Sequence, residues 1–187
     1  MKTKINAHYP HHKITDHDSS IYIADCTEQT KDDLVKIGIE ITPVKPADIN
    51  SFLVENNKSI PFSSIKFDNK SFVDDTTGKT LSQCECVGFS SAEYSKEPWV
   101  LFLKLKYCTP YSRYQKENMD HAKEQLTDTY KYYKRKGIIN NKQQCYLVVS
   151  FPNFVNTQAD VRDMKLKKVI FRGVNELKIK NEFKLEV

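Results

Sequence analysis

The amino-acid sequence predicts an α/β protein of the mixed α+β kind, with a central mixed β-sheet flanked by helices. Apolar, strand-like segments at 99–108 and 144–152 indicate the sheet, and an amphipathic segment at 112–137 indicates a long helix between them. The chain has 187 residues, which is enough for a single domain, 1–187, with a substantial core.

The first part of the chain is predicted to hold short elements. In chain order they are a strand at 19–27, a helix at 30–37, a strand at 38–44, a helix at 46–57, a hairpin at 62–75 and a turn at 75–79. The helix at 46–57 is predicted because Pro46 suits the first position of a helix and because Ile49, Phe52 and Leu53 fall on one side. Residues 1–18, which are rich in histidine, are expected to form a flexible arm.

The second part of the chain gives stronger signals. A helix is predicted at 112–137, because its apolar residues recur at spacings of three and four and Gly137 follows "KRK" as a helix end. The inward residues of this helix are Met119, Ala122, Leu126, Tyr130 and Tyr133. Strands are predicted at 80–90, 99–108 and 144–152, with two or three short strands in 167–187.

Composition restricts the class of protein. An apolar content of 39% and an aromatic content of 11% exclude a disordered chain. No segment approaches the roughly 18 consecutive apolar residues of a membrane span, and the beginning of the chain carries no signal-like apolar run. Five cysteines, an odd number, then indicate reduced thiols and a cytoplasmic protein.

The charge of the chain is unevenly distributed. Residues 1–100 carry 11 Lys and Arg against 15 Asp and Glu, a net of −4, whereas residues 101–187 carry 18 against 9, a net of +9. A basic half of this kind is typical of a protein that binds nucleic acid or an acidic protein partner. The candidate binding residues are Lys134, Arg135, Lys136, Lys165, Lys167 and Lys168.

Two lysines lie on one face of the strand at 99–108. Because side chains alternate along a strand, Lys104 and Lys106 share the face of Phe102, whereas Leu101, Leu103 and Leu105 share the other. The leucine face is expected to pack against helix 112–137. If 80–90 and 99–108 form an antiparallel hairpin, one of two registers places Glu85 opposite Lys104 as a cross-strand ion pair.

The order hairpin, strand, long helix and apolar strand over 72–152 resembles the core of the PD-(D/E)xK nuclease superfamily, which has the restriction-endonuclease-like fold. The resemblance places Glu85 at the first acid of the family motif and Lys106 at its lysine, and it implies Mg²⁺ as the cofactor of an active member. Lys104 stands where the second carboxylate of the motif belongs. The resemblance therefore implies a nuclease framework with a degenerate active site, without a metal and without enzymatic activity.

Two alternatives remain open at the level of the sequence. In the first, the chain is an active Mg²⁺-dependent nuclease with Glu85 as a metal ligand and with its second acid moved to the helix, as Asp120 or Glu117. Helical phase places both of these acids toward solvent. In the second, the chain is a small inhibitor or immunity-type protein that binds another protein and has no nucleic-acid role.

Overall fold

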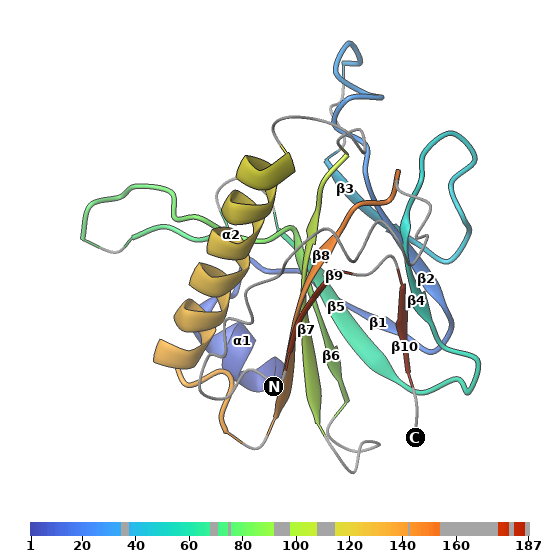
Figure 1. Ribbon diagram of the computed structural model, residues 1–187. Coiled ribbons are helices and arrows are strands. Elements are labelled where there is room, and N and C mark those ends of the chain that lie inside the picture. Colours follow the sequence, from blue (N-terminus) through green and yellow to red (C-terminus); the bar gives the residue numbers. More distant parts are fainter. Residues whose placement is uncertain are drawn as a thin grey trace.

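The computed structural model describes residues 1–34, 38–67, 71–74, 76–91, 98–107, 115–141, 143–153, 176–179 and 182–185. In these residues the chain forms two β-sheets that face each other, with helices on the outer face of the larger sheet (Figure 1). The predicted mixed α/β class is thus confirmed. Helices cover only one face of the large sheet in the described part of the chain, because the small sheet covers the other.

The large sheet has the strand order β1-β5-β6-β7-β8-β9. The pairs β1–β5, β5–β6 and β6–β7 are antiparallel, whereas the pairs β7–β8 and β8–β9 are parallel, so that the sheet is mixed. The strand bounds are Ile14–His17 (β1), Phe62–Lys66 (β5), Cys86–Ser90 (β6), Trp99–Leu105 (β7), Gln144–Ser150 (β8) and Glu176–Ile179 (β9).

The small sheet has the strand order β10-β4-β2-β3. Strand β2 pairs antiparallel with β3 and β4, and β10 pairs parallel with β4. The strand bounds are Ile21–Asp25 (β2), Ile39–Thr42 (β3), Phe52–Glu55 (β4) and Glu182–Lys184 (β10). The end of the chain therefore returns to pair with a strand from its first third.

Helix α2, Gln115–Arg135, is the long helix that the sequence predicts. Its five predicted inward residues are all buried. The helix ends at a glycine in the left-handed region, since Gly137 has a φ of +64°. The N–H of Gly137 donates to the carbonyl of Lys134, and that of Ile138 donates to the carbonyl of Tyr133, which satisfies two carbonyls of the last helical turn.

The core has two parts, one on each face of the large sheet. Val100 and Phe102 of β7 lie in the part that contains Met119, Leu126 and the other inward residues of α2. Leu101, Leu103 and Leu105 lie in the part shared with the small sheet. The expectation that the three leucines pack against the helix is therefore wrong: both faces of β7 are apolar, and the unforeseen second sheet covers the leucine face.

In the part of the chain that the structure describes, two of the predicted helices are not found. Segment 46–57 contains strand β4 instead, because Phe52 and Val54 alternate inward and pair with β2 on one side and β10 on the other. The described part of 30–37 consists of turns and bends, and residues 35–37 lie outside the described residues. In the region of the expected hairpin 62–75, β5 pairs with β1 and β6, and the expected turn at 68–69 is not described.

The N-terminal segment is ordered instead of forming the expected arm. Helix α1, Lys2–His8, is followed by β1, which pairs with β5 at the edge of the large sheet. Ile5 and His12 are buried, and Tyr9 joins the aromatic part of the core beside Phe72. This segment is polar in composition, but Ile5 and Tyr9 are buried in the core on the helix side of the large sheet.

Candidate functional site

The ion pair between Glu85 and Lys104 is the centre of the candidate site. Strands β6 and β7 pair with Cys86 opposite Leu103, so that Glu85 comes opposite Lys104, which is one of the two registers possible for this hairpin. Nζ of Lys104 lies 2.5 Å from Oε1 of Glu85, and the two side chains are only 12% and 11% exposed. The pair is therefore close and largely removed from water.

Backbone hydrogen bonds fix the position of Glu85. Its N–H donates to the carbonyl of Leu103 over 3.0 Å, and its carbonyl accepts from the N–H of Phe67 over 2.8 Å. Its second carboxylate oxygen accepts from the N–H of Leu105. Burial raises the pKa of Glu85, and the opposing effects of Lys104 and of this backbone N–H do not cancel the rise.

Two further residues lie just after β7. The N–H of Lys106 donates to the carbonyl of Ser150, which continues the pairing with β8, and its side chain is half-buried. The hydroxyl of Tyr107 donates to the carbonyl of Asn50 over 2.7 Å and accepts from the N–H of Asp25 over 3.3 Å. Burial raises the pKa of Tyr107 to about 12, so the hydroxyl stays protonated and ties this end of β7 to the small sheet.

The side chains around Glu85 do not fit a Mg²⁺ ion. This ion prefers several hard oxygen ligands, but the oxygens of Glu85 are already occupied by an ammonium group and a backbone N–H. An ammonium group beside the carboxylate also repels a cation. In the described part of the chain, no three His, Cys, Asp or Glu side chains gather as a metal site would require.

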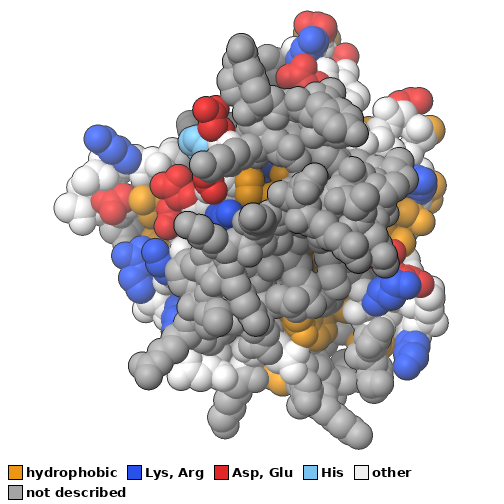
Figure 2. Space-filling view, in the orientation of Figure 1, with side chains coloured by type: hydrophobic (Ala, Val, Ile, Leu, Met, Phe, Trp, Pro, Cys, Tyr) orange, Lys and Arg blue, Asp and Glu red, His pale blue; other side chains and the backbone are white. Residues whose placement is uncertain are grey.

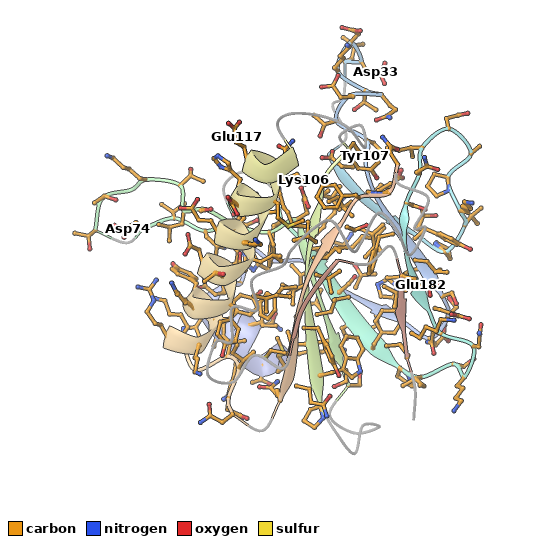
Figure 3. All side chains as sticks on the ribbon, in the orientation of Figure 1. Asp33, Asp74, Lys106, Tyr107, Glu117 and Glu182 are labelled. Carbon is orange, nitrogen blue, oxygen red and sulfur yellow. The ribbon has the colours of Figure 1, made fainter. Side chains whose placement is uncertain are left out.

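The two acids proposed as migrated ligands lie on the exposed side of α2. Glu117 is exposed, and Asp120 is 59% exposed with Oδ1 3.4 Å from Nζ of Lys123. Figure 3 shows Glu117 projecting outward from the first turn of α2, away from Lys106. Together with His121 and Glu124 they form an acidic surface, which is visible in Figure 2 as red and pale-blue side chains near the start of this helix.

The basic residues at the end of α2 contact aromatic rings. The cationic groups of Arg135 and Lys136 lie 5.3 and 5.9 Å from the ring centre of Tyr132, and that of Lys134 lies 5.5 Å from the ring centre of Tyr130. Positive charge here also suits the C-terminal end of the helix dipole. The other candidate binding residues, Lys165, Lys167 and Lys168, lie outside the described residues.

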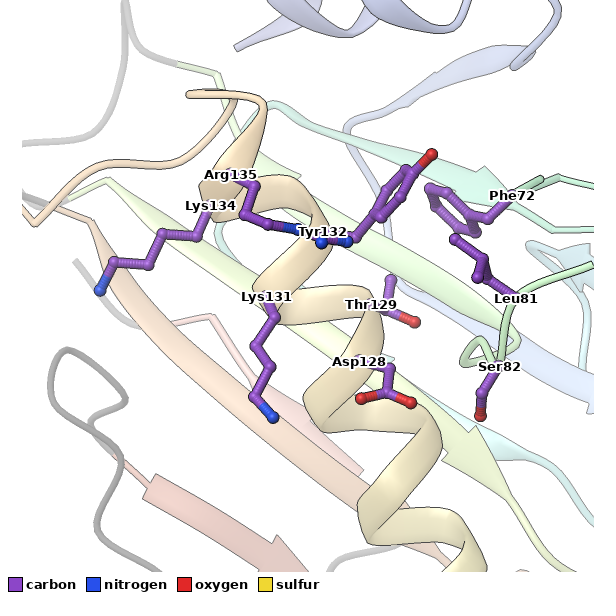
Figure 4. A pocket seen from close by; sticks show the side chains of 9 residues that line it. All are labelled: Phe72, Leu81, Ser82, Asp128, Thr129, Lys131, Tyr132, Lys134 and Arg135. Carbon is purple, nitrogen blue, oxygen red and sulfur yellow. The ribbon is translucent and has the colours of Figure 1, made fainter. Parts of the chain in front are cut away.

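The structure also contains a groove that the sequence analysis does not foresee. It has a volume of about 540 Å³ and lies between the second half of α2 and the loop of residues 71–84 (Figure 4). Its lining residues are Phe72, Leu81, Ser82, Asp128, Thr129, Lys131, Tyr132, Lys134 and Arg135. The alternation of tyrosines with Lys and Arg in α2 is the sequence signal closest to this groove, but the position of the loop depends on tertiary structure.

The cysteines near the candidate site are poor nucleophiles. Cys84 and Cys86 are buried on either side of Glu85, and burial raises the pKa of Cys84 to about 12 and that of Cys86 well above its ordinary value. Because the thiolate is the reactive form, these thiols are inert at neutral pH. Buried in this way, the two cysteines act as small hydrophobic residues of the core.

Comparisons of the chain with known protein families, with curated protein sequences and with solved structures found no match. None of the helices in the described residues combines the length and apolar character that crossing a membrane requires.

Proposed function

We propose that this chain is a non-enzymatic module that binds nucleic acid on a scaffold of the restriction-endonuclease type. The observation that carries the proposal is the buried ion pair between Glu85 and Lys104. It occupies the two positions at which the resemblance to PD-(D/E)xK nucleases expects two metal-binding carboxylates. An ammonium group in place of the second acid closes the position to a divalent cation while the strand framework is kept.

The strand arrangement supports the scaffold part of the proposal. Strands β5, β6 and β7 form an antiparallel series, and α2 then leads to β8, which lies parallel to β7. This arrangement agrees with the order hairpin, strand, helix and strand on which the resemblance rests, although β5 precedes the residues 72–152 that the resemblance covers. The Glu85–Lys104 pair lies at the end of β7 from which the chain leads toward α2.

The binding part of the proposal rests on the basic second half of the chain. Phosphate contacts from Lys and Arg hold nucleic acid with little sequence information, and they supply most of its non-specific affinity. In the described residues, Lys131, Lys134 and Arg135 bring positive charge to the second half of α2. Lys165, Lys167 and Lys168, which lie outside the described residues, belong to the same basic half of the sequence.

The proposal is tested by fluorescence anisotropy with labelled single-stranded and duplex DNA and RNA of about 30 nucleotides, starting at about 20 mM salt. We expect binding that weakens steeply as salt is added, because phosphate contacts release counterions. A variant with Lys134, Arg135 and Lys136 changed to Gln should bind more weakly, with a salt slope reduced by roughly one for each lost contact.

The matched control changes Lys13, Lys45 and Lys58 to Gln, since these three lysines are exposed and lie in connections outside the helices and strands. It should leave the affinity and the salt slope unchanged. Absence of binding at about 20 mM salt would refute the proposal and favour an acidic protein partner, since non-specific affinity is greatest at low salt. Cleavage of the labelled strands in Mg²⁺ that Asp120→Asn or Glu117→Gln abolishes would instead support the active nuclease.

A further inference from the structure

The groove beside α2 is preformed because hydrogen bonds hold the loop of residues 71–84 against the helix. The hydroxyl of Tyr132 donates to the carbonyl of Val73 over 3.2 Å, and the N–H of Cys84 donates to Oγ1 of Thr129 over 2.9 Å. The Thr129 hydroxyl in turn donates to the carbonyl of Gln125. The protein's own hydrogen bonds therefore hold the loop against the helix on both sides of the hollow.

The size and lining of the groove fit a small ligand. Its volume of about 540 Å³ lies within the roughly 300–1,000 Å³ of ordinary ligand sites. Phe72, Leu81 and Tyr132 supply apolar surface, and Ser82 and Asp128 supply polar groups. A mostly apolar hollow with a few polar groups is suited to a flat ring with a polar edge.

The charge of the groove favours a ligand that carries an anionic group beside its flat ring. Three cationic side chains line it against a single carboxylate, that of Asp128, which leaves a net charge of +2. Figure 4 shows Arg135 lying across Tyr132 at one end of the groove, whereas Lys131 and Lys134 extend away from Leu81 and Ser82. The Arg135 guanidinium, 5.3 Å from the Tyr132 ring centre, is thus the cation best placed to meet an anionic group.

Asp128 faces the opposite wall. In Figure 4 its carboxylate and the Ser82 hydroxyl approach each other across the groove, one from α2 and one from the 71–84 loop. Burial raises the pKa of Asp128, while Lys131 and Arg135 act to lower it. A carboxylate in this position accepts hydrogen bonds and so favours a ring that carries an amino group at its edge.

We propose that this groove binds one unpaired nucleotide of a single-stranded nucleic acid, with a preference for a base that carries an exocyclic amino group. The base lies between Leu81 and the Arg135–Tyr132 stack, its amino group donates to Asp128, and its phosphate meets Arg135. Flat bases stack on guanidinium groups, and carboxylates accept from the amino group of cytosine. This inference rests on the proposed function and names its ligand class.

The test compares the affinities of labelled dC12 and dT12, which differ in the base edge and keep the same backbone, together with a blunt hairpin duplex. We expect dC12 to bind roughly five- to tenfold more tightly than dT12, because only cytosine presents an amino group to Asp128. Asp128→Asn should remove this preference, because the amide offers both a donor and an acceptor.

Two pairs of variants distinguish binding in the groove from binding through positive charge alone. Ser82→Trp fills the hollow at an exposed position and should abolish the preference for dC12 while duplex binding is kept, whereas Thr76→Trp, which adds the same ring at an exposed position outside the groove lining, should change neither. Arg135→Ala should weaken dC12 binding more than Lys131→Ala, although both remove one positive charge. Thermal denaturation of each variant confirms that the fold is intact.

The outcomes distinguish the two proposals. If the oligonucleotides bind in a salt-dependent way but dC12 and dT12 bind alike, or if Asp128→Asn and Ser82→Trp leave the preference unchanged, the groove inference is overturned and the proposed function stands. If none of the probes binds at about 20 mM salt, where phosphate contacts are strongest, both are overturned.

Discussion

At the scale of single residues, Lys104 neutralises a carboxylate that is almost fully removed from water. Its ammonium group lies 2.5 Å from Oε1 of Glu85, and both side chains are about nine-tenths buried. Such a pair contributes little to the free energy of unfolding compared with an apolar pair of the same shape. Removal of one member, however, leaves a buried charge without a partner. The two substitutions that follow use this asymmetry in opposite ways.

Lys104→Met should lower the free energy of unfolding by roughly 3–5 kcal/mol at neutral pH, because Glu85 loses its counter-charge. The loss should be smaller in acid. The pKa of Glu85 is raised in the folded state, so stability is greatest below the unfolded pKa and falls as the pH rises through the folded pKa. Removal of the ammonium raises that folded pKa further.

Chemical denaturation of Lys104→Met at about pH 5 and pH 8 checks this expectation, with less stability expected at the higher pH. The double variant Glu85→Gln/Lys104→Met is the control. Because it has no carboxyl group at position 85, its stability should not show the extra fall between about pH 5 and pH 8 that is expected for Lys104→Met. An equal loss at both pH values would mean that Glu85 reaches water when Lys104 is removed.

Lys104→Glu should place two carboxylates side by side at the ends of β6 and β7. Their repulsion should lower stability without metal and raise the pKa of one of them. Added Mg²⁺ or Mn²⁺ should then raise the melting temperature, since a cation bound only by the folded state stabilises by about 2.7 kcal/mol at a hundred times its Kd.

Lys106→Glu is the control for this experiment, because position 106 follows the end of β7, whereas the register of β6 and β7 places position 104 opposite Glu85. Its melting temperature should rise much less when Mg²⁺ or Mn²⁺ is added. A melting temperature of Lys104→Glu that does not respond to metal would show that positions 85 and 104 do not converge.

At the scale of elements, strand β7 is apolar on both faces, and each face packs against a different layer. Leu105→Ala should cost on the order of 2–5 kcal/mol, because this side chain is buried between the two sheets. Leu34→Ala is the matched control, since Leu34 is fully exposed, and should leave stability unchanged.

Double-mutant cycles identify the layer that Leu105 contacts. Leu105→Ala combined with Ile23→Val should show an interaction energy of roughly 0.5 kcal/mol or more, because both side chains lie in the core between the sheets. Leu105→Ala combined with Leu126→Ala should be additive, since Leu126 lies on the other face of the sheet. Coupling to Leu126 alone would restore the assignment made from the sequence.

At the scale of the whole molecule, the N-terminal segment closes the helix side of the core. The Ile5 side chain is fully buried there, and Lys4 donates from Nζ to the carbonyl of Gly137, just past the end of α2. Ile5→Ala should therefore lower the free energy of unfolding by about 2–5 kcal/mol, as for other buried aliphatic residues.

The control for this expectation is Lys4→Ala, which removes a surface hydrogen bond and should cost less than about 1 kcal/mol. Chemical denaturation measures both variants. If Ile5→Ala denatured at the same concentration as the natural chain, the N-terminal segment would be an arm that contributes nothing to the core.

The sequence by itself determined the elements with strong periodicity. Helix α2, its five inward residues and its end at Gly137 follow from apolar spacing and from a terminal glycine, because these signals are local. Strands β7 and β8 follow from their apolar runs. The register that pairs Glu85 with Lys104 was one of two that the turn length allowed, and it brings the charges into contact.

Tertiary structure decided which layer of the protein packs against each face of β7. Because β7 is apolar on both faces, alternation could not show that Leu103 faces the small sheet while Phe102 faces α2. Residues 52–55 fit either a helix or a strand, and pairing with β2 and β10 made them a strand. The groove beside α2 arises only where the 71–84 loop meets the helix, through contacts between residues distant in sequence, such as Tyr132 and Val73, that no local pattern records.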